Sequence, residues 1–228
     1  MKKLLSTLSF CLIFVYGYAQ TPSIDKEKLF DLYQTQRYAE AGDYLKSAYG
    51  EQTNDLKALT QIGYCFLMAG NNIEAERFYN KAYNLQPQNL PILFSLGSIN
   101  TRRGNVEKAK LYYGEITKID SNNFNVYKLL ANLYMQDSIK LNYLLKANTI
   151  NPVEADVASD LAEILAIYQD YEKAYAVLDI AIKADSENLV LQRAKLPAAN
   201  KLKKYNEVIN SGERVLKDDK DAGVIKDV

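Results

Sequence analysis

Residues 59–82, LTQIGYCFLMAGNNIEAERFYNKA, contain two amphipathic segments separated by a short turn. Apolar and small residues recur in each segment at spacings of three and four, which place them on one face of an α-helix. These residues are Leu59, Ile62, Gly63 and Phe66 in the first segment and Ala75, Phe78, Tyr79 and Ala82 in the second. The intervening Gly70-Asn71-Asn72 tolerates the left-handed conformation that ends a helix. The stretch therefore predicts two antiparallel helices joined by a tight turn.

Small apolar residues extend this pattern along the chain at a nearly constant step. The series Ala48, Ala82, Ile116, Ala147, Ala181 and Val215 advances by 34 residues each time, except for one step of 31. The period divides the chain into six units, residues 22–55, 56–89, 90–123, 124–154, 155–188 and 189–222. The fourth unit is three residues short, and we expect the loss in its inter-helix turn near Gln136-Asp137-Ser138.

The last unit contains two residues that disfavour helices. Pro197 falls inside its expected first helix and Gly212 inside its second, where they cost about 3 and about 1 kcal/mol relative to alanine. We therefore expect this unit to be kinked or frayed. Residues 223–228 have the apolar spacing of a further first helix just beginning, which favours the hypothesis that the sequence is the N-terminal part of a longer chain.

The 34-residue step, Ile62-Gly63 and Leu96-Gly97 in first helices, and the alanines, aromatic residues and prolines of the second helices resemble the tetratricopeptide repeat family. The resemblance covers residues 22–222 and is closest to exported bacterial members. It departs from the family at Leu29, where a small residue is usual, and in the absence of tryptophan. It implies an all-α, right-handed α-solenoid of about six helix-turn-helix repeats, in which each pair covers the apolar face of the one before.

The first 19 residues predict a secretory signal peptide, because Lys2 and Lys3 precede an apolar run that ends in small residues. That run is too short to span a bilayer, and no later stretch is as apolar. Cys11 follows Phe10 inside the run, which disfavours a lipid anchor. We expect an exported protein that is periplasmic, secreted or associated with the outer membrane. Removal of the leader leaves 26 Lys and Arg against 28 Asp and Glu, a balance that does not favour nucleic acid as a partner.

The residues do not supply a catalytic set. Histidine is absent from the sequence, which removes the commonest general base and metal ligand. No phosphate-binding glycine motif is present, and Cys65, the one cysteine after the leader, has no neighbouring base in sequence and is interpreted as a packed thiol. We therefore expect no enzymatic activity, no cofactor and no metal site. Asp156, Asp160 and Glu163 share one helical face, either as an ordinary solvated stripe or as an acidic recognition patch.

Members of the resembled family bind peptides on a concave face lined by first helices, which implies a protein or peptide partner here. The matching positions are Phe30, Tyr33, Tyr64, Met68, Phe94, Asn125, Lys128, Asn132, Gln136, Asp156, Asp160 and Glu163. This surface changes from aromatic to amide-rich and then acidic along the chain. Only Lys128 and Asn132 match the family's clamp for a terminal carboxylate, so that clamp is not expected.

Three functions fit this surface. The leading hypothesis is a non-catalytic scaffold of the cell envelope that binds proteins or unfolded segments, because aromatic side chains provide large contact areas and amides pair with main chains. The second is the sensory or docking part of a larger exported or membrane-bound protein, motivated by the unfinished seventh unit. The third is glycan binding, since aromatic surfaces also stack on sugars.

Overall fold

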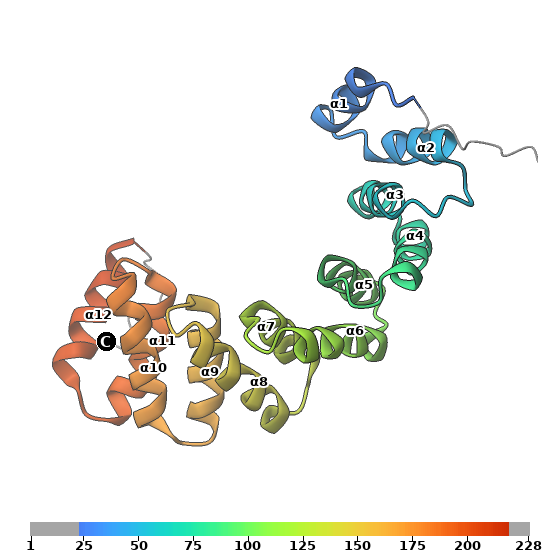
Figure 1. Ribbon diagram of the computed structural model, residues 1–228. Helices are drawn as coiled ribbons and strands as arrows, with labels where there is room; N and C mark the ends of the chain where they lie inside the picture. Colours follow the sequence, from blue (N-terminus) through green and yellow to red (C-terminus); the bar gives the residue numbers. More distant parts are fainter. Residues whose placement is uncertain (1–22, 219–228) are drawn as a thin grey trace, which may run out of the picture.

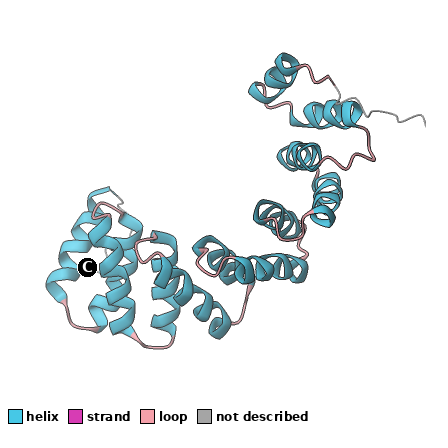
Figure 2. Ribbon diagram, in the orientation of Figure 1, coloured by secondary structure: helices cyan, strands magenta, loops and turns pink. Residues whose placement is uncertain are grey.

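The computed structural model describes residues 23–218, which form twelve α-helices and no strand (Figures 1 and 2). The first helices of the six hairpins are α1 (Lys26–Gln34), α3 (Leu56–Met68), α5 (Leu90–Arg102), α7 (Phe124–Leu133), α9 (Ala155–Ile167) and α11 (Leu189–Lys201). The second helices are α2 (Tyr38–Tyr49), α4 (Asn72–Leu85), α6 (Val106–Ile119), α8 (Asp137–Ile150), α10 (Tyr171–Ala184) and α12 (Tyr205–Asp218). The predicted all-α solenoid is confirmed. The expected leader, residues 1–19, and the expected further helix, residues 223–228, lie outside the described residues.

Side chains at the start of most first helices cap the exposed backbone N–H groups. Asp55, Asn89 and Asn123 each accept a hydrogen bond from the backbone N–H three residues later, at 3.0, 3.2 and 3.3 Å. Asp25 and Asn188 do the same at 3.0 and 3.2 Å. Such caps satisfy donors that have no partner within the helix and fix where it begins.

The turn between the two helices of a hairpin repeats as well. Gly70 and Gly104 have φ values of 77° and 74°, and the backbone N–H of Asn71 donates to the carbonyl of Phe66 at 2.9 Å. The corresponding positions of three other hairpins hold non-glycine residues with positive φ, namely Gln36 at 56°, Gln169 at 61° and Lys203 at 59°. The left-handed residue lets the chain reverse direction while satisfying the last carbonyls of the first helix.

The fourth hairpin is shortened at a different place from the one predicted. Its first helix, α7, has 10 residues where α3, α5, α9 and α11 have 13, whereas α8 has 14, like α4 and α6. Asp137 and Ser138 therefore belong to α8 and not to a turn. The three missing residues come from the end of α7, because three residues connect α7 to α8 just as three connect α5 to α6. The chain leaves α7 through Tyr134 in an extended conformation, with φ −103° and ψ 126°.

The sixth hairpin was expected to be kinked or frayed, and the expectation of fraying is wrong. α11 runs as one helix from Leu189 to Lys201 with Pro197 inside it, and α12 continues through Gly212. Packing explains this, because Leu196 and Ala199 are buried in a cluster with Val208 of α12. Lys195 adds ion pairs to Asp179 of α10 at 2.9 Å and to Glu207 of α12 at 3.0 Å. These contacts offset the helix propensities that motivated the prediction.

Tight helix crossings build the core in the second and third hairpins. A Cβ atom added to Gly63 would lie 2.9 Å from the Tyr79 ring, and one added to Gly97 would lie 2.2 Å from the Tyr113 ring. Each tyrosine thus packs directly on the backbone of the facing helix. Besides the small cluster of Leu196, Ala199 and Val208, the buried side chains form one cluster from Leu32 to Ile99 and another from Leu93 to Ala198, and these two both include side chains of α5. The apolar core is therefore drawn out along the solenoid.

Candidate binding surface

The first helices lie on the inner side of the curved chain. Figure 1 shows α1, α3 and α5 along the inside of the arc and α2, α4 and α6 along the outside. One repeat position shows how the inner surface changes, and its occupants are Phe30, Tyr64, Ser98, Asn132, Glu163 and Pro197. All except Ser98 are exposed, and Ser98 is half-buried. The same place on successive helices thus carries aromatic, then amide, then acidic chemistry.

Three tyrosines at the N-terminal end of this surface form an aromatic patch, which we define as Tyr33, Tyr38 and Tyr64. The Tyr33 and Tyr38 rings lie 6.1 Å apart and the Tyr38 and Tyr64 rings 6.2 Å apart, the latter edge to face. Tyr64 remains 44% exposed. Phe30 on α1 and Met68 on α3 are exposed on the same two helices, at 64% and 46%. Exposed aromatic rings on rigid helices provide contact area at low entropic cost, which is typical of protein-binding surfaces.

Cys65 stands behind this patch and is not a reactive thiol. Its Sγ lies 3.4 Å from the Tyr33 hydroxyl, and the side chain is fully buried. Burial raises the pKa of Cys65, with a smaller lowering contribution from the hydrogen bond to Tyr33. Burial is also the main cause of the raised pKa of Tyr33, and the hydrogen bond to Cys65 adds to it. Both groups therefore stay neutral at physiological pH, which suits a packing role.

The expected residues in the middle of the surface have different environments. Phe94 is half-buried and packs against Tyr113 with ring centroids 6.3 Å apart, so much of it belongs to the core. Asn125 and Asn132 on α7 are exposed. Gln136 does not lie on a first helix, because α7 ends early and Gln136 is the N-cap residue of α8.

Lys128 is neutralised by its neighbours. Its Nζ lies 2.7 Å from Asp156 and 3.1 Å from Glu154. The hydrogen bond to Asp156 is the largest cause of the raised pKa of Lys128, which burial opposes and the bond to Glu154 reinforces. An ammonium group that already faces two carboxylates is a poor receptor for a third, which argues against a clamp for a terminal carboxylate.

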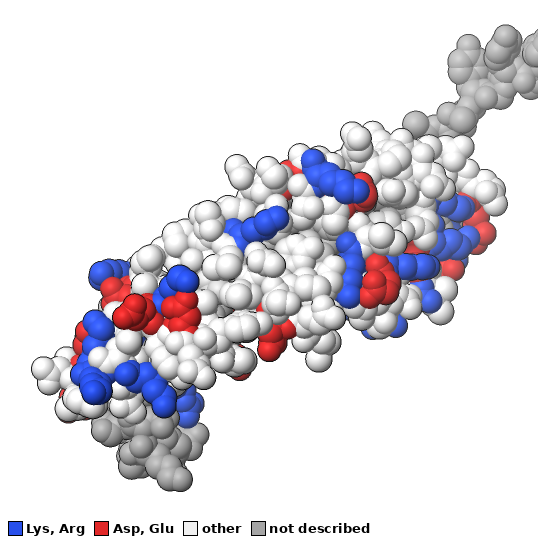
Figure 3. Space-filling view, turned by 90° about the horizontal axis from the view of Figure 1, so that it is seen from below, with Lys and Arg blue, Asp and Glu red and all other residues white. Residues whose placement is uncertain are grey.

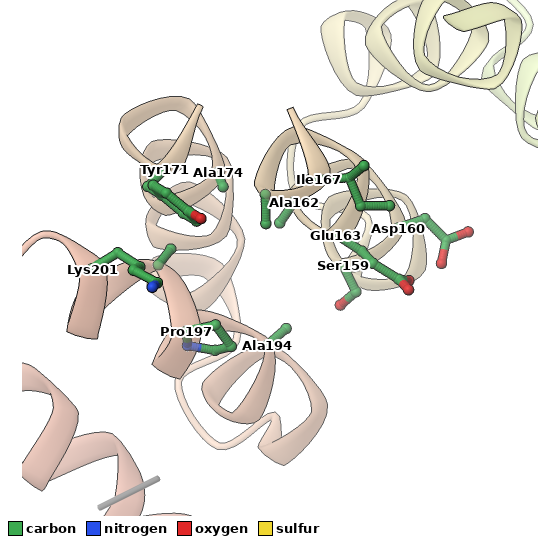
Figure 4. A pocket seen from close by; sticks show the side chains of 12 residues that line it. Ser159, Asp160, Ala162, Glu163, Ile167, Tyr171, Ala174, Ala194, Pro197 and Lys201 are labelled. Carbon is green, nitrogen blue, oxygen red and sulfur yellow. The ribbon is translucent and has the colours of Figure 1, made fainter. Parts of the chain in front are cut away.

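A pocket of about 570 Å³ opens between α9 and α11 (Figure 4). We call it the α9–α11 pocket. Its apolar lining comes largely from alanines of three helices, Ala162 and Ala166 of α9, Ala174 of α10, and Ala194 and Ala198 of α11. Figure 4 shows Ser159 and Glu163 on one side, with the Tyr171 hydroxyl and the Lys201 ammonium directed toward the same space from α10 and α11. Asp160 lies beside Glu163 at the outer rim.

Two polar groups in this pocket have unusual environments. The Ser159 Oγ is buried and has no hydrogen-bond partner. The Asp160 carboxyl has a pKa above its ordinary value, mainly because of burial, with Glu163 and Asp156 adding to the rise and Lys140 and Lys128 opposing it. Buried polar atoms without partners are uncommon in folded proteins, and perturbed carboxyl groups in a concavity are typical of binding sites.

The structure brings together Asp160 and Glu163, as predicted, and adds residues that sequence reasoning did not select. Lys201 and Pro197 both line the pocket, although Pro197 was expected only to disturb its helix. Tyr171 occupies the same repeat position as Tyr38, the first residue of a second helix. The recurrence of tyrosine at this position, also seen at Tyr205, was a signal available in the sequence.

Other kinds of site find little support within residues 23–218. This part of the chain contains no group of three or more potential metal ligands. None of its helices combines the length and apolar character needed to cross a bilayer. On the face seen in Figure 3, basic and acidic side chains are interspersed among broad uncharged areas, and no extended basic stripe of the kind that binds nucleic acid is visible.

Comparison with solved structures identifies the fold. The chain is similar to the C-terminal part of a TPR repeat-containing protein from Cytophaga hutchinsonii, with TM-score 0.69 and 12% identity over 84% of this chain and 78% of that one. It is similar to PilF of Pseudomonas aeruginosa, with TM-score 0.67 and 16% identity over 88% and 92% of the two chains. It is also similar to YrrB, described as a TPR protein with an unusual peptide-binding site, with TM-score 0.64 and 14% identity over 81% and 96%. No family model and no curated protein matches the sequence.

Proposed function

We propose that this tetratricopeptide-repeat solenoid is a non-catalytic scaffold of the cell envelope that binds a protein or peptide segment along its concave face. The observation that carries the proposal is the inner surface itself, where an aromatic patch and a pocket are built mainly from first helices, with Tyr38 and Tyr171 added from second helices. A curved row of helices presents a long surface to an extended partner, as repeat proteins generally do. Exposed rings, amides and carboxylates on that surface suit a polypeptide.

Two further observations support the proposal. YrrB, which shares the fold at TM-score 0.64, is described as having a peptide-binding site. The sequence of residues 1–19 has the charge and apolar pattern of an export signal, which motivates placement in the envelope. The missing histidine and the packed environment of Cys65 favour binding over catalysis.

The inner surface is tested by capture of partners from an envelope extract. The double variant Phe30→Ala and Tyr64→Ala removes two exposed rings from α1 and α3 without emptying the core, since they are 64% and 44% exposed. The matched control is Ile73→Ala and Leu111→Ala on second helices α4 and α6, which are 68% and 69% exposed. We expect the first variant to lose most of the captured protein and the control to behave as wild type. Equal recovery with both variants would exclude this part of the surface from binding.

The envelope location has its own test. Residues 1–25 are fused to an alkaline phosphatase that lacks a leader and is active only after export from the cytoplasm. We expect phosphatase activity from this fusion and none from a fusion in which Leu12→Arg and Phe14→Arg interrupt the apolar run. An inactive first fusion, expressed at the same level, would remove the envelope from the proposal and leave peptide binding to stand on the concave face.

A further inference from the structure

We propose that the α9–α11 pocket anchors one aliphatic side chain of the bound segment, and that a neighbouring Lys or Arg of the segment lies against Glu163 and Asp160. This assignment rests on the proposed function and specifies the chemistry that the C-terminal half of the surface recognises. Three features of the pocket each fit a different part of one bound peptide. They are the alanine lining, the unpaired carboxylates and the serine oxygen without a hydrogen-bond partner.

The lining favours an aliphatic side chain as the buried part. Alanines of α9, α10 and α11 together with Ile167 and Pro197 supply the apolar part of the pocket wall. The space of about 570 Å³ is large enough for a branched side chain together with the main chain that carries it. An aliphatic group placed there exchanges water for apolar contacts, which is the dominant favourable term in most protein associations.

The charges favour a cation on the α9 side. Of the three carboxylates on this face, Asp156 is paired with Lys128 at 2.7 Å. Asp160 and Glu163 have no ion-pair partner among the described residues 23–218. Burial and the neighbouring carboxylates raise the pKa of Asp160, so its ionised form is held at a free-energy cost that a ligand cation would reduce. On the opposite wall, Lys201 disfavours a second cation and orients the segment.

The remaining polar groups suit a main chain. The buried Ser159 Oγ lacks a hydrogen-bond partner, and the Tyr171 hydroxyl points into the same space. An extended segment brings one N–H donor and one carbonyl acceptor for every residue, and either hydroxyl can serve as donor or acceptor. A peptide main chain offers donors and acceptors to polar groups lining this space, such as the Tyr171 hydroxyl, which a purely hydrocarbon ligand does not.

Selection of random dodecapeptides on the full chain tests this assignment. We expect the enriched peptides to share a Leu, Ile, Val or Met next to a Lys or Arg, and we would measure their affinities by fluorescence anisotropy. Ala194→Leu fills the pocket from the partly exposed face of α11 and is expected to weaken binding at least tenfold. Ala176→Leu, on an exposed position of α10 outside the pocket, is the matched control and is expected to leave affinity unchanged.

The charge requirement is tested with a second pair of variants. Asp160→Asn with Glu163→Gln is expected to weaken the enriched peptides at least fivefold at low salt and to flatten the salt dependence of binding. Glu172→Gln with Glu187→Gln removes two exposed carboxylates of the same hairpin and serves as the control. Glu163→Lys is expected to shift the selected consensus from a cationic to an acidic neighbour, a change that a merely destabilised protein would not produce.

The outcomes separate this inference from the proposed function. Enriched peptides that lack the cation–aliphatic pair, or that bind Ala194→Leu as tightly as wild type, overturn the pocket assignment while peptide binding stands. Failure to enrich any peptide, with envelope proteins still captured through Phe30 and Tyr64, also overturns it and leaves the scaffold intact. Loss of both peptide enrichment and envelope capture in the wild-type chain overturns the scaffold together with the pocket.

Discussion

The second and third hairpins and the sixth hairpin place the large residue of the same helix crossing on opposite helices. In the former, glycine on the first helix faces tyrosine on the second, as Gly63 with Tyr79 and Gly97 with Tyr113. The fifth hairpin has Ala162 and Leu178 at the corresponding positions, again 16 residues apart. The sixth has Leu196 and Gly212, which reverses the order of large and small. In these four hairpins the two positions combine one small and one large residue, and either helix can supply the large one.

This comparison accounts for a residue that looked unfavourable in isolation. Gly212 costs about 1 kcal/mol relative to alanine by helix propensity. It is nevertheless buried, at the repeat position where Tyr79 and Tyr113 lie, and Leu196 occupies the place of the crossing glycine. The last hairpin therefore keeps a close helix approach with the side chain supplied from α11. The N-terminal crossings depend on steric fit, and the C-terminal end adds ion pairs around Lys195.

The largest effect is expected where the N-terminal fit is tightest. Gly97→Ala places a Cβ 2.2 Å from the Tyr113 ring, whereas Gly63→Ala places one 2.9 Å from Tyr79. We expect Gly97→Ala to lower the free energy of unfolding by about 2 to 3 kcal/mol and Gly63→Ala by about 1 kcal/mol, after the gain in helix propensity. Urea unfolding followed by circular dichroism measures both.

A double-mutant cycle sharpens this prediction. Combining Gly97→Ala with Tyr113→Leu recreates the alanine–leucine pair of the fifth hairpin, so the two changes together should cost at least about 1 kcal/mol less than their sum. Ala162→Gly with Leu178→Tyr is the reciprocal exchange in the C-terminal half. Additive effects in the first cycle would contradict the idea that the two positions share one volume.

The next largest effect concerns the ion cluster of the C-terminal half. The Lys195 side chain is 8% exposed, and its ammonium group pairs with both Asp179 and Glu207. Lys195→Met keeps the aliphatic part of the side chain but removes this shared ammonium group. We expect the free energy of unfolding to fall by about 2 kcal/mol. This is below the usual range for a fully buried ion pair, because the Glu207 side chain is 40% exposed. Thermal unfolding at pH 7 measures it, and Lys183→Met, whose side chain is 75% exposed, should cost much less.

The same cluster makes the stability of the wild-type fold depend on pH in the acidic range. Hydrogen bonds from Lys183 and Lys195 lower the pKa of Asp179, and the bond from Tyr175 followed by that from Lys195 lowers the pKa of Glu207. Their stabilising contribution is present above the ordinary values of 3.8 and 4.5 and is lost as pH falls through the lower folded values. Lys195→Met should show less stability loss between pH 5 and about pH 2 than wild type. An unchanged acid profile would contradict the role of these carboxylates.

A smaller gain is expected at the hairpin turns. The second and third hairpins use Gly70 and Gly104 at the left-handed position, whereas the fifth uses Gln169 with φ 61°. Gln169→Gly should raise the free energy of unfolding by about 1 kcal/mol, because a side chain is strained in this conformation. The measurement is again urea unfolding, with Gln169→Ala as the control. A destabilised glycine variant would show that the glutamine side chain contributes a contact that outweighs the backbone strain.

The smallest effect is expected for Asp160 of the pocket, whose charge should destabilise the fold, whereas the charges of the carboxylates around Lys195 should stabilise it. The pKa of Asp160 is raised by burial and by Glu163, so its ionised form opposes folding at neutral pH. Asp160→Asn should therefore raise the melting temperature slightly at pH 7. The gain should disappear as pH falls below the ordinary value of 3.8, where the wild-type carboxyl is protonated in both states. A lower melting temperature at pH 7 would indicate that Asp160 stabilises the fold.

Most of the fold could be predicted from sequence because each hairpin repeats its own signals. A small or apolar residue on the second helix, an Asp or Asn cap at most first helices and a turn residue recur with the period, so Ala82 or Asn89 is informative in its own unit and in the next. The length of a unit does not reveal which part of it is shorter. Loss of a helical turn from α7 and loss of three loop residues would give the same distance in sequence between neighbouring repeats. The sixth hairpin was misjudged because helix propensity describes Gly212 alone, without the leucine opposite it.

The candidate site was only partly accessible to the same reasoning. Asp160 and Glu163 could be assigned to one helical face by their spacing of three residues. Tyr171 and Lys201 come from other helices, and their meeting with Glu163 depends on how far α9 and α11 stand apart, which a repeat period does not specify. Phe94 was predicted to be a surface residue, but its ring packs against Tyr113 and is therefore partly buried.

The shortened α7 lies between the aromatic patch at one end of the inner surface and the α9–α11 pocket at the other. Three fewer residues remove about 4.5 Å of helix from the inner wall, and the exposed side chains left there include Asn125 and Asn132. A partner long enough to reach both the tyrosines of α1–α3 and the pocket of α9–α11 would be held as a divalent ligand. Release from one end would leave the other end bound and the released end nearby, so residence time would depend on the linker between the two anchors as well as on the strength of each.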